Sequence, residues 1–362
     1  MKIGLLLCAN LEKAQYLYKY VELLDSMKCD YDVIYWNRNL SDYSIQCSGS
    51  FISFDEKMDS FKHLIWKTTG YIRFSRFVHI IIKKNQYDKL ILFTTPTAVS
   101  VLDLCFGKYK GKYLFDYRDL TKEYFKPYMK LVQKVACLAE VFVTSSPGYL
   151  QNFELEKIKK WVLCHNTYKD ISYKKTLKLS TERPILISYW GAVRQVEYNK
   201  KVCELFGNDK RFKFVYHGEG AYDELSQFCK EKGIENIHFT GRYLLKEIEK
   251  FAAETDILFN AYDTDFVTTP SLAVKVYDSM VYQLPLIVSK DTYMESYLQD
   301  YEHVFSFSLN NKSVLDELFE WYTNLDKDKT IHSFEKLHSK ISEDEMIFKK
   351  SLEGFVDYEA CN

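Results

Sequence analysis

The sequence has 362 residues, of which 47% are hydrophobic and 27% charged, and a formal net charge of −1. This composition is typical of a soluble globular protein, and the length fits two domains of roughly 150–200 residues each. The nine cysteines include no Cys-x-x-Cys pair, which argues against a metal knuckle and a disulfide framework. The first apolar run is too short for a signal peptide and no run reaches the roughly 18–20 residues of a membrane span, so we expect a cytoplasmic protein.

The first half of the chain alternates short apolar runs with amphipathic stretches. This alternation is typical of βα units built around a mainly parallel sheet. The expected strands are Lys2–Cys8, Tyr31–Tyr35, Lys89–Phe93, Tyr113–Asp116, Val141–Thr144 and Trp161–Cys164. The expected helices are Ala14–Leu24, Tyr71–Lys84 and Tyr124–Ala139.

A polar stretch without an apolar period, residues 169–183, separates this half from a second βα series. We interpret it as the linker between a domain at 1–168 and a domain at 184–340. The second series has expected strands at Pro184–Tyr189, Phe212–Tyr216, Ile237–Thr240, Asp256–Asn260 and Leu286–Val288, and expected helices at Leu244–Glu254 and Val274–Tyr282. The tail, 341–362, has a helical period from Glu343 to Glu359.

The charge is unevenly divided between the halves. Residues 1–168 carry 24 Lys and Arg against 17 Asp and Glu, whereas residues 169–362 carry 25 against 33. On the wheel of the helix expected at 71–84, the basic side chains gather opposite the apolar side, and they are Arg73, Arg76, Lys83 and Lys84. Either this is a core-packed helix with a solvated basic face, or the face docks on anionic lipid at the membrane. Nucleic acid is disfavoured because the net charge is near zero.

Three expected strands of the second half run directly into glycine turns. These junctions contain Gly191 with Arg194 and Lys200 beyond it, Gly218 with Gly220, and Gly241 with Arg242. The carboxyl ends of parallel strands open onto one crevice, where doubly wound sheets bind their ligands. Cations at that edge suit a diphosphate leaving group, although Arg194 and Lys200 can equally be solvated residues at a helix start. No Gly-x-Gly-x-x-Gly follows the first strand, which disfavours a dinucleotide there.

The last motif precedes the strand at Leu286–Val288. Thr269 or Ser271 is a candidate cap for a helix beginning near residue 272, whose free amides would hold a phosphate. Lys275 and Asp278 share one face of that helix, so the ammonium can meet phosphate while the carboxylate accepts ribose hydroxyls. The alternative is an ordinary i,i+3 ion pair on the surface.

Together, the segments of 184–290 resemble the retaining GT-B glycosyltransferases of family 4, which include many bacterial polysaccharide-assembly enzymes. Gly191 to Arg194 resembles the family's glycine turn with its phosphate-binding base, and Lys200 its accompanying lysine. Gly218 and Gly220 resemble its Gly-x-Gly turn and Gly241 the glycine before its base-binding segment. Asp278 stands where the family has its ribose-binding Glu, whereas Pro270 stands where an earlier Glu is usual.

In the first half, which resembles the family only loosely, a polar cluster ends the strand at 113–116. It looks like the family's loop facing the donor. The resemblance implies that Asp119 orients or deprotonates the acceptor hydroxyl and that Arg118 stabilises phosphate or holds Asp119. The alternative is that Asp119 caps a helix and pairs with Arg118.

The resemblance implies two Rossmann-like domains with parallel sheets facing across a cleft, with the final helix returning toward the first domain. It implies metal-independent transfer, with retention, from a nucleoside diphosphate sugar, UDP-sugar first, to a glycan or lipid-linked glycan acceptor, with no resident cofactor. The enzyme would be cytoplasmic or peripheral on the inner face of the membrane. A non-catalytic scaffold of the same fold and a non-hydrolysing UDP-sugar epimerase are the alternatives.

Overall fold

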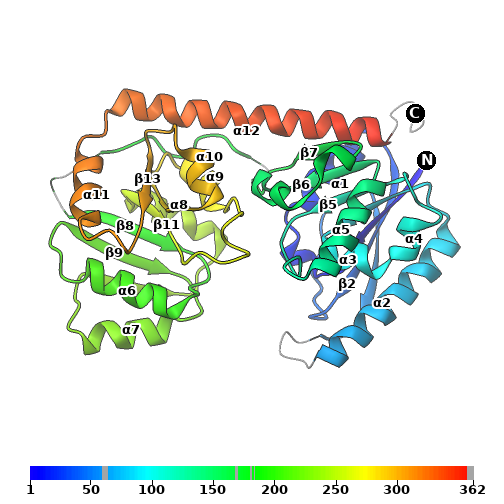
Figure 1. Cartoon of the computed structure of the whole chain (residues 1–362), viewed down its shortest axis with the longest axis horizontal. Coiled ribbons are helices and arrows are strands. Elements are labelled where there is room, and N and C mark those ends of the chain that lie inside the picture. Colours follow the sequence, from blue (N-terminus) through cyan, green and yellow to red (C-terminus); the bar gives the residue numbers. More distant parts are fainter. Residues whose placement is uncertain (59–63, 168–169, 180–181, 183, 357–362) are drawn as a thin grey trace. The chain divides into compact units, whose positions relative to one another are not determined.

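The computed structural model describes residues 1–58, 64–167, 170–179, 182 and 184–356. The chain divides into two compact units, which we call unit 1 (Met1–Lys169 with Ser342–Asn362) and unit 2 (Asp170–Ile341). Each unit contains one parallel sheet with helices on both faces (Figure 1). The expectation of two α/β domains with parallel sheets is therefore confirmed.

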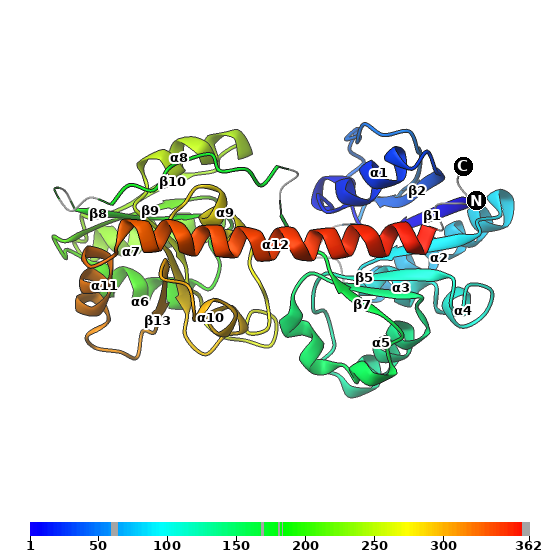
Figure 2. The same ribbon diagram turned by 90° about the horizontal axis from the view of Figure 1, so that it is seen from above.

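Unit 1 has a seven-stranded sheet in the order β3-β2-β1-β4-β5-β6-β7. Its strands are β1 Lys2–Leu7, β2 Asp30–Asn37, β3 Ser50–Asp55, β4 Lys89–Phe93, β5 Tyr113–Tyr117, β6 Val141–Thr144 and β7 Trp161–Leu163. Its helices are α1 Leu17–Ser26, α2 Leu64–Asn85, α3 Thr95–Ser100, α4 Leu102–Phe106 and α5 Lys126–Leu138, with 3-10 turns at Leu11–Lys13, Pro147–Asn152 and Leu155–Lys157. One face of the sheet packs against α1 and the other against α2 to α5 (Figure 2).

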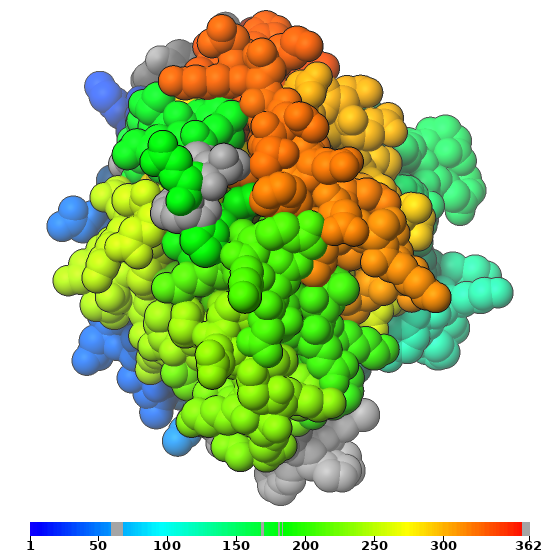
Figure 3. Space-filling model, turned by 90° about the vertical axis from the view of Figure 1, so that its left-hand side faces the viewer, coloured from blue at the N-terminus to red at the C-terminus, as the bar shows by residue number. Residues whose placement is uncertain are grey.

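Unit 2 has a six-stranded sheet in the order β10-β9-β8-β11-β12-β13. Its strands are β8 Ile185–Trp190, β9 Phe212–His217, β10 Ile237–Gly241, β11 Ile257–Asn260, β12 Leu286–Ser289 and β13 Val304–Phe307. Its helices are α6 Val196–Phe206, α7 Tyr222–Glu231, α8 Ile248–Glu254, α9 Lys275–Val281, α10 Tyr293–Leu298 and α11 Val314–Thr323, with a 3-10 turn at Leu245–Glu247. Helices α6, α7 and α11 cover one face, and their residues lie at the surface in Figure 3.

The last helix, α12 (Lys327–Val356), is continuous through the boundary between the two units. Leu337 and Ile341 are buried in the core of unit 2, whereas Phe348 and Leu352 are buried against α1 in unit 1. The helical period expected from residue 343 onward is therefore confirmed as far as residue 356, and the expected helix end at 357–359 lies outside the described residues.

Two strands, β3 and β13, were not predicted from the sequence. Both lie at an edge of their sheet, so each pairs on one side only. The side chains of β3 are half-buried at its four central positions, and β13 is only four residues long. Neither segment has a long apolar run or a clear alternation, and these are the signals on which strand prediction depends.

The packing of α2 follows the expected helical wheel. Phe74 and Val78 are buried against the sheet of unit 1, and Arg76, Lys83 and Lys84 are exposed on the other side. The same outer side also carries Ile72 and Ile80, which are 47% and 65% exposed. No helix in the described part of the chain is long and apolar enough to cross a membrane.

Candidate functional site

The glycine turns after β8, β9 and β10 lie side by side at the carboxyl edge of the unit 2 sheet. The amide of Gly191 donates to the carbonyl of His217 (2.9 Å), and the amide of Gly218 donates to the carbonyl of Gly241 (2.8 Å). This arrangement follows from the parallel order β10-β9-β8. The three strands therefore end at the same edge of the sheet, and the crevice expected above them stays a prediction.

Glycine is required at two of these positions by the close approach of the neighbouring backbone. A Cβ on Gly218 would lie 1.8 Å from the carbonyl oxygen of Gly191, and a Cβ on Gly220 would lie 2.3 Å from that of Val193. Their φ angles, +152° and +112°, also favour glycine. Glycine at these two positions therefore lets the turns after β8 and β9 pack backbone against backbone.

The ammonium of Lys275 lies directly over the first of these turns. A Cβ on Gly191 would stand 2.8 Å from its Nζ atom, and Nζ lies 5.4 Å from the centre of the Tyr189 ring. Burial lowers the pKa of Lys275, Asp278 opposes the shift and Arg194 adds to it. A half-buried cation that has lost part of its hydration is suited to bind an anion, because the anion replaces the lost water.

Asp278 is buried, whereas the sequence motif predicted a carboxylate on an accessible helix face. Its side chain is only 2% exposed, and it accepts a hydrogen bond of 2.8 Å from the indole nitrogen of Trp190 at the end of β8. The alternative of a surface ion pair with Lys275 is therefore wrong. Asp278 joins α9 to β8, and its contact with ribose hydroxyls stays a prediction.

The loop after β11 completes the edge of the site. Strands β8 and β11 are neighbours although they are far apart in sequence, and this is the point where the strand order reverses. Gln195 bridges the two loops, donating to the carbonyl of Asp263 (3.0 Å) and accepting from its amide (2.9 Å). In open α/β sheets, ligands bind at such a switch point.

The expected helix cap is wrong. Helix α9 begins at Lys275, and its N-cap residue, Val274, makes no side-chain cap. Ser271 instead donates to the carbonyl of Val267 (2.6 Å), and the amide of Tyr293 donates to the carbonyl of Thr269 (2.8 Å). Tertiary packing of the 263–274 loop overrides the local preference of these residues for a cap, so both belong to the loop that flanks the switch point.

The other expected cations lie on the surface. Lys200 forms ion pairs with Glu197 (3.0 Å) and Glu224 (2.8 Å). Arg194 is exposed, and Arg242 lies 3.8 Å from Glu219 with its side chain 83% exposed. A phosphate that reached Lys200 would have to displace two carboxylates, so Lys275 is better placed for an anion than Lys200.

In unit 1, the polar cluster after β5 is largely internal. Arg118 is 1% exposed and pairs with Asp116 (2.8 Å), which also accepts from Tyr20 (2.6 Å). The guanidinium donates further to the carbonyl of Cys164 (2.9 Å) and to the side chain of Asn166 (3.0 Å). The guanidinium of Arg118 is buried and bound to these partners, which disfavours a contact with phosphate, and its charge still acts on Asp119. Both expected roles of Arg118 stay predictions.

Asp119 is the exposed member of this cluster. Loss of hydration raises its pKa, Arg118 opposes the shift, and the nearby Asp116 and Glu123 add to it. It does not cap α5, whose N-cap residue is Phe125. The alternative of a helix cap paired with Arg118 is therefore wrong, and Asp119 keeps its candidacy as an acidic group at a strand end.

Two aromatic residues of the site were missed from the sequence. Tyr189 and Trp190 end β8, and they contact Lys275 and Asp278 respectively. The sequence offered one signal, a pair of aromatic residues directly before a glycine turn. His217, also at this edge, is stacked on Phe251 at 3.7 Å, and burial lowers its pKa to about 4.

No protein-family model matches the chain, and no curated protein matches it in sequence. Solved structures do match over nearly the full length. Sucrose-phosphate synthase from Thermosynechococcus elongatus is 11% identical with a TM-score of 0.70, and the match covers 100% of this chain and 96% of that one. Anabaena HepE, solved with UDP and glucose, is 14% identical with a TM-score of 0.65, and 99% of each chain is covered.

A third match is the lipopolysaccharide outer core galactosyltransferase WaaB, which is 12% identical with a TM-score of 0.63. It covers 96% of this chain and 100% of that one. The chain therefore has the two-domain GT-B fold that these glycosyltransferases share, as the sequence resemblance implied. At identities this low the likeness establishes the fold alone.

Proposed function

We propose that the chain is a glycosyltransferase that moves a sugar from a nucleoside diphosphate sugar, UDP-sugar first, to a hydroxyl group. The observation that carries this proposal is the ammonium of Lys275 over the Gly191 turn, at the switch point of a GT-B fold. A diphosphate there would receive a fixed cation and the exposed backbone of the glycine turns. The negative charge on a diphosphate grows as it leaves, so this cation stabilises the transition state more than the ground state.

The remaining donor contacts are assigned by position. We propose that Gly191, Gly218, Gly220 and Gly241 let the donor approach the backbone, and that Thr269 and Ser271 flank its phosphates. Asp278, held by Trp190, would present a carboxylate edge to the ribose. Arg194 and Arg242 are exposed and Lys200 is half-buried in its ion pairs, and we propose that a charged ligand meets these three cations as it approaches.

The finer features of the reaction are part of the same proposal. We propose that transfer proceeds with retention and without a metal ion, Lys275 supplying the positive charge. The acceptor would be a lipid-linked glycan in cell-surface polysaccharide assembly, with Asp119 orienting or deprotonating its hydroxyl. The raised pKa of Asp119 suits it to take up a proton. The exposed basic side of α2 would bring the enzyme to the anionic inner face of the membrane.

Calorimetric titration with UDP, GDP and ADP tests the proposal directly. We expect one nucleotide to bind to the wild type and Lys275→Met to weaken it strongly. Lys230→Met, which removes an exposed lysine from α7, serves as the control and should bind as the wild type does. Equal affinities of Lys275→Met and the wild type would contradict the assignment.

Turnover separates the alternatives that share this fold. We expect UDP release from a UDP-sugar to require an acceptor and Asp119→Asn to lower kcat while leaving nucleotide affinity unchanged. Nucleotide binding without turnover on any acceptor would identify a non-catalytic scaffold. Interconversion of the donor sugar without an acceptor would identify an epimerase.

A further inference from the structure

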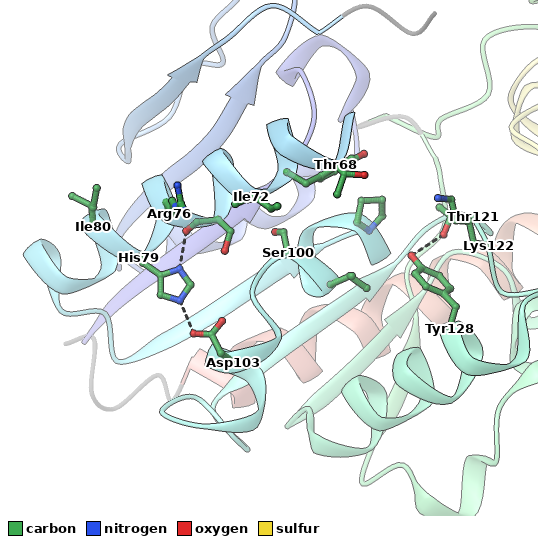
Figure 4. A pocket seen from close by; sticks show the side chains of 14 residues that line it. Thr68, Ile72, Arg76, His79, Ile80, Ser100, Asp103, Thr121, Lys122 and Tyr128 are labelled. Atoms are coloured by element: carbon green, nitrogen blue, oxygen red, sulfur yellow. Dashed lines mark hydrogen bonds and ion pairs between the residues drawn. The ribbon is translucent and has the colours of Figure 1, made fainter. Parts of the chain in front are cut away.

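An apolar groove of about 1130 Å³ lies in unit 1, between α2 on one side and α3, α4 and the loop after β5 on the other (Figure 4). Its walls include Ile72 and Ile80 from α2 and Pro96 and Val99 from α3. The two isoleucines are 47% and 65% exposed although they are large and apolar. Large apolar side chains exposed together in a groove are typical of a ligand-binding or interaction site.

Several uncharged polar side chains of the groove already have hydrogen-bond partners within the protein. His79 is bound at both ring nitrogens, to the carbonyl of Ser75 (2.7 Å) and to Asp103 (2.6 Å). Ser100 donates to the carbonyl of Thr97 (2.7 Å). At the opposite end of the groove, the hydroxyls of Thr121 and Tyr128 lie 3.1 Å apart and bond to each other (Figure 4).

This engagement decides between classes of ligand. A peptide or a sugar buried in the groove would need hydrogen bonds for its own polar groups, and each one left unmade is costly. A hydrocarbon chain needs none. The walls therefore suit an extended hydrocarbon, and along α2 the lining residues from Thr68 to Ile80 span about 18 Å.

Two cations line the groove, Arg76 and Lys122. Neither forms an ion pair with any residue that the structure describes. Lys122 lies in the loop that follows β5, three residues after Asp119, and the neighbouring Tyr124 and Phe125 are 68% and 58% exposed. The loop that carries Asp119 thus also contributes a cation, Lys122, to one end of the groove, and two exposed aromatic residues follow it in the chain.

We propose that this groove binds one hydrocarbon chain of an anionic amphiphile, with the phosphate of its head group at Lys122. The inference rests on the proposed function, since it defines the acceptor as a lipid phosphate whose sugar hydroxyls lie beyond the phosphate, toward Asp119. Arg76 meets the same negative charge from the side of α2. Lipid recognition then comes from a groove that holds a chain, in addition to any attraction between basic residues and a membrane surface.

The test uses octyl, decyl and dodecyl phosphate below their critical micelle concentrations, with inorganic phosphate as the probe without a chain. Calorimetric titration of the full chain should give an affinity that rises roughly fourfold for each CH₂ buried. Inorganic phosphate should bind far more weakly. Affinity that does not depend on chain length would overturn the proposal.

Matched variants locate the binding. Ile72→Asp should remove most of the dependence on chain length. Ile347→Asp on α12 is the matched control, since the two isoleucines are equally exposed at 47% and 48%. It should leave the dependence unchanged, because Ile347 does not line the groove. Lys122→Gln should weaken all three alkyl phosphates by a similar factor, and Lys112→Gln, which removes another exposed lysine, should not. Equal behaviour of Ile72→Asp and Ile347→Asp would also overturn the proposal.

Two further measurements separate the remaining outcomes. If the chain dimerises in solution and Ile72→Asp dissociates the dimer without any alkyl phosphate binding, the groove holds a second copy and the proposal fails. Titration of the same variants with UDP tests the proposed donor site independently of the groove. UDP binding without alkyl phosphate binding rejects the groove alone, and the reverse result rejects the proposed donor site alone.

Discussion

The carboxyl ends of the two sheets contain similar residues but use them differently. In unit 1 the residues after β5 form a closed network in which Arg118 is buried and saturated by Asp116, Cys164 and Asn166. In unit 2 the turns after β8 to β10 are glycine backbone, and the cation over them, Lys275, has lost hydration without gaining an ion pair among the described residues. The first edge is suited to hold its own structure and the second to hold a ligand.

The difference teaches that a charged residue at a strand end is a functional candidate only when its partners are known. Arg118 and Lys275 looked alike in sequence, each being a cation near an acidic residue. Satisfied hydrogen bonds make Arg118 a structural residue. Incomplete solvation makes Lys275 a candidate anion site.

The largest expected effect comes from breaking the closed network. Arg118→Met leaves Asp116 buried without its cation, which should destabilise the protein by about 3–5 kcal/mol. The double variant Asp116→Asn/Arg118→Met should recover part of this loss, since no charge is left buried alone. Urea unfolding measures both. An Arg118→Met variant with wild-type stability and no activity would restore Arg118 to the catalytic residues.

The second prediction compares the two lysines of unit 2. Lys275→Met should weaken nucleotide diphosphate binding by about tenfold to a hundredfold, because a charge-assisted hydrogen bond contributes about 1.5–3 kcal/mol. Lys200→Met should change it by less than about threefold, because Lys200 is paired with Glu197 and Glu224. If the order of the two effects is reversed, the ligand lies on the α6 rim and not over Gly191.

The third prediction concerns acid. Burial lowers the pKa of His217 to about 4 and that of His303 to about 3, both in unit 2. The folded state keeps these rings neutral while the unfolded chain takes up protons below pH 6.5, so stability falls as the pH drops from 6.5 toward 4. Between pH 7 and 5 each group should remove about 2 kcal/mol.

Unit 1 offers the opposite case in His79. Burial lowers its pKa, but the hydrogen bonds to Ser75 and Asp103 outweigh this effect and raise it. The contribution of His79 to folding stability is therefore present at low pH and is lost as the pH rises through its pKa in the folded state. Hydrogen exchange at pH 7 and 5 should show β9 and β13 losing protection before β4 and β5. An unchanged acid response in His303→Gln would contradict this origin.

The smallest effects are expected on the basic side of α2. Arg76, Lys83 and Lys84 should each contribute about 1 kcal/mol to binding of anionic vesicles, and binding should weaken with salt. Arg73 should contribute less, since it is paired with Glu56. Co-sedimentation of single Gln variants and of the fourfold variant measures this order. If the wild type ignores anionic vesicles at low salt, the basic side is only a solvated surface.

The sequence by itself determined the strands of both sheets other than β3 and β13, and the glycine turns at the edge of unit 2. Apolar periodicity is a local property, and it placed β4 and β6 to the residue. The turn at Gly218 was visible because a positive φ angle and close backbone contact leave little choice but glycine. The periodicity depends on neighbours in the chain, and the glycines are visible as a residue type, although the contact that requires Gly218 is made with the distant Gly191 turn.

Only the tertiary structure decided what the polar residues do. Arg118 is held by Cys164, 46 residues away, and Asp278 by Trp190, 88 residues away. The groove beside α2 exists because α3, α4 and the loop after β5 come to lie opposite Ile72 and Ile80. Hydration, burial and hydrogen-bond partners are set by residues distant in the chain, and a polar side chain becomes structural or ligand-binding according to those three quantities.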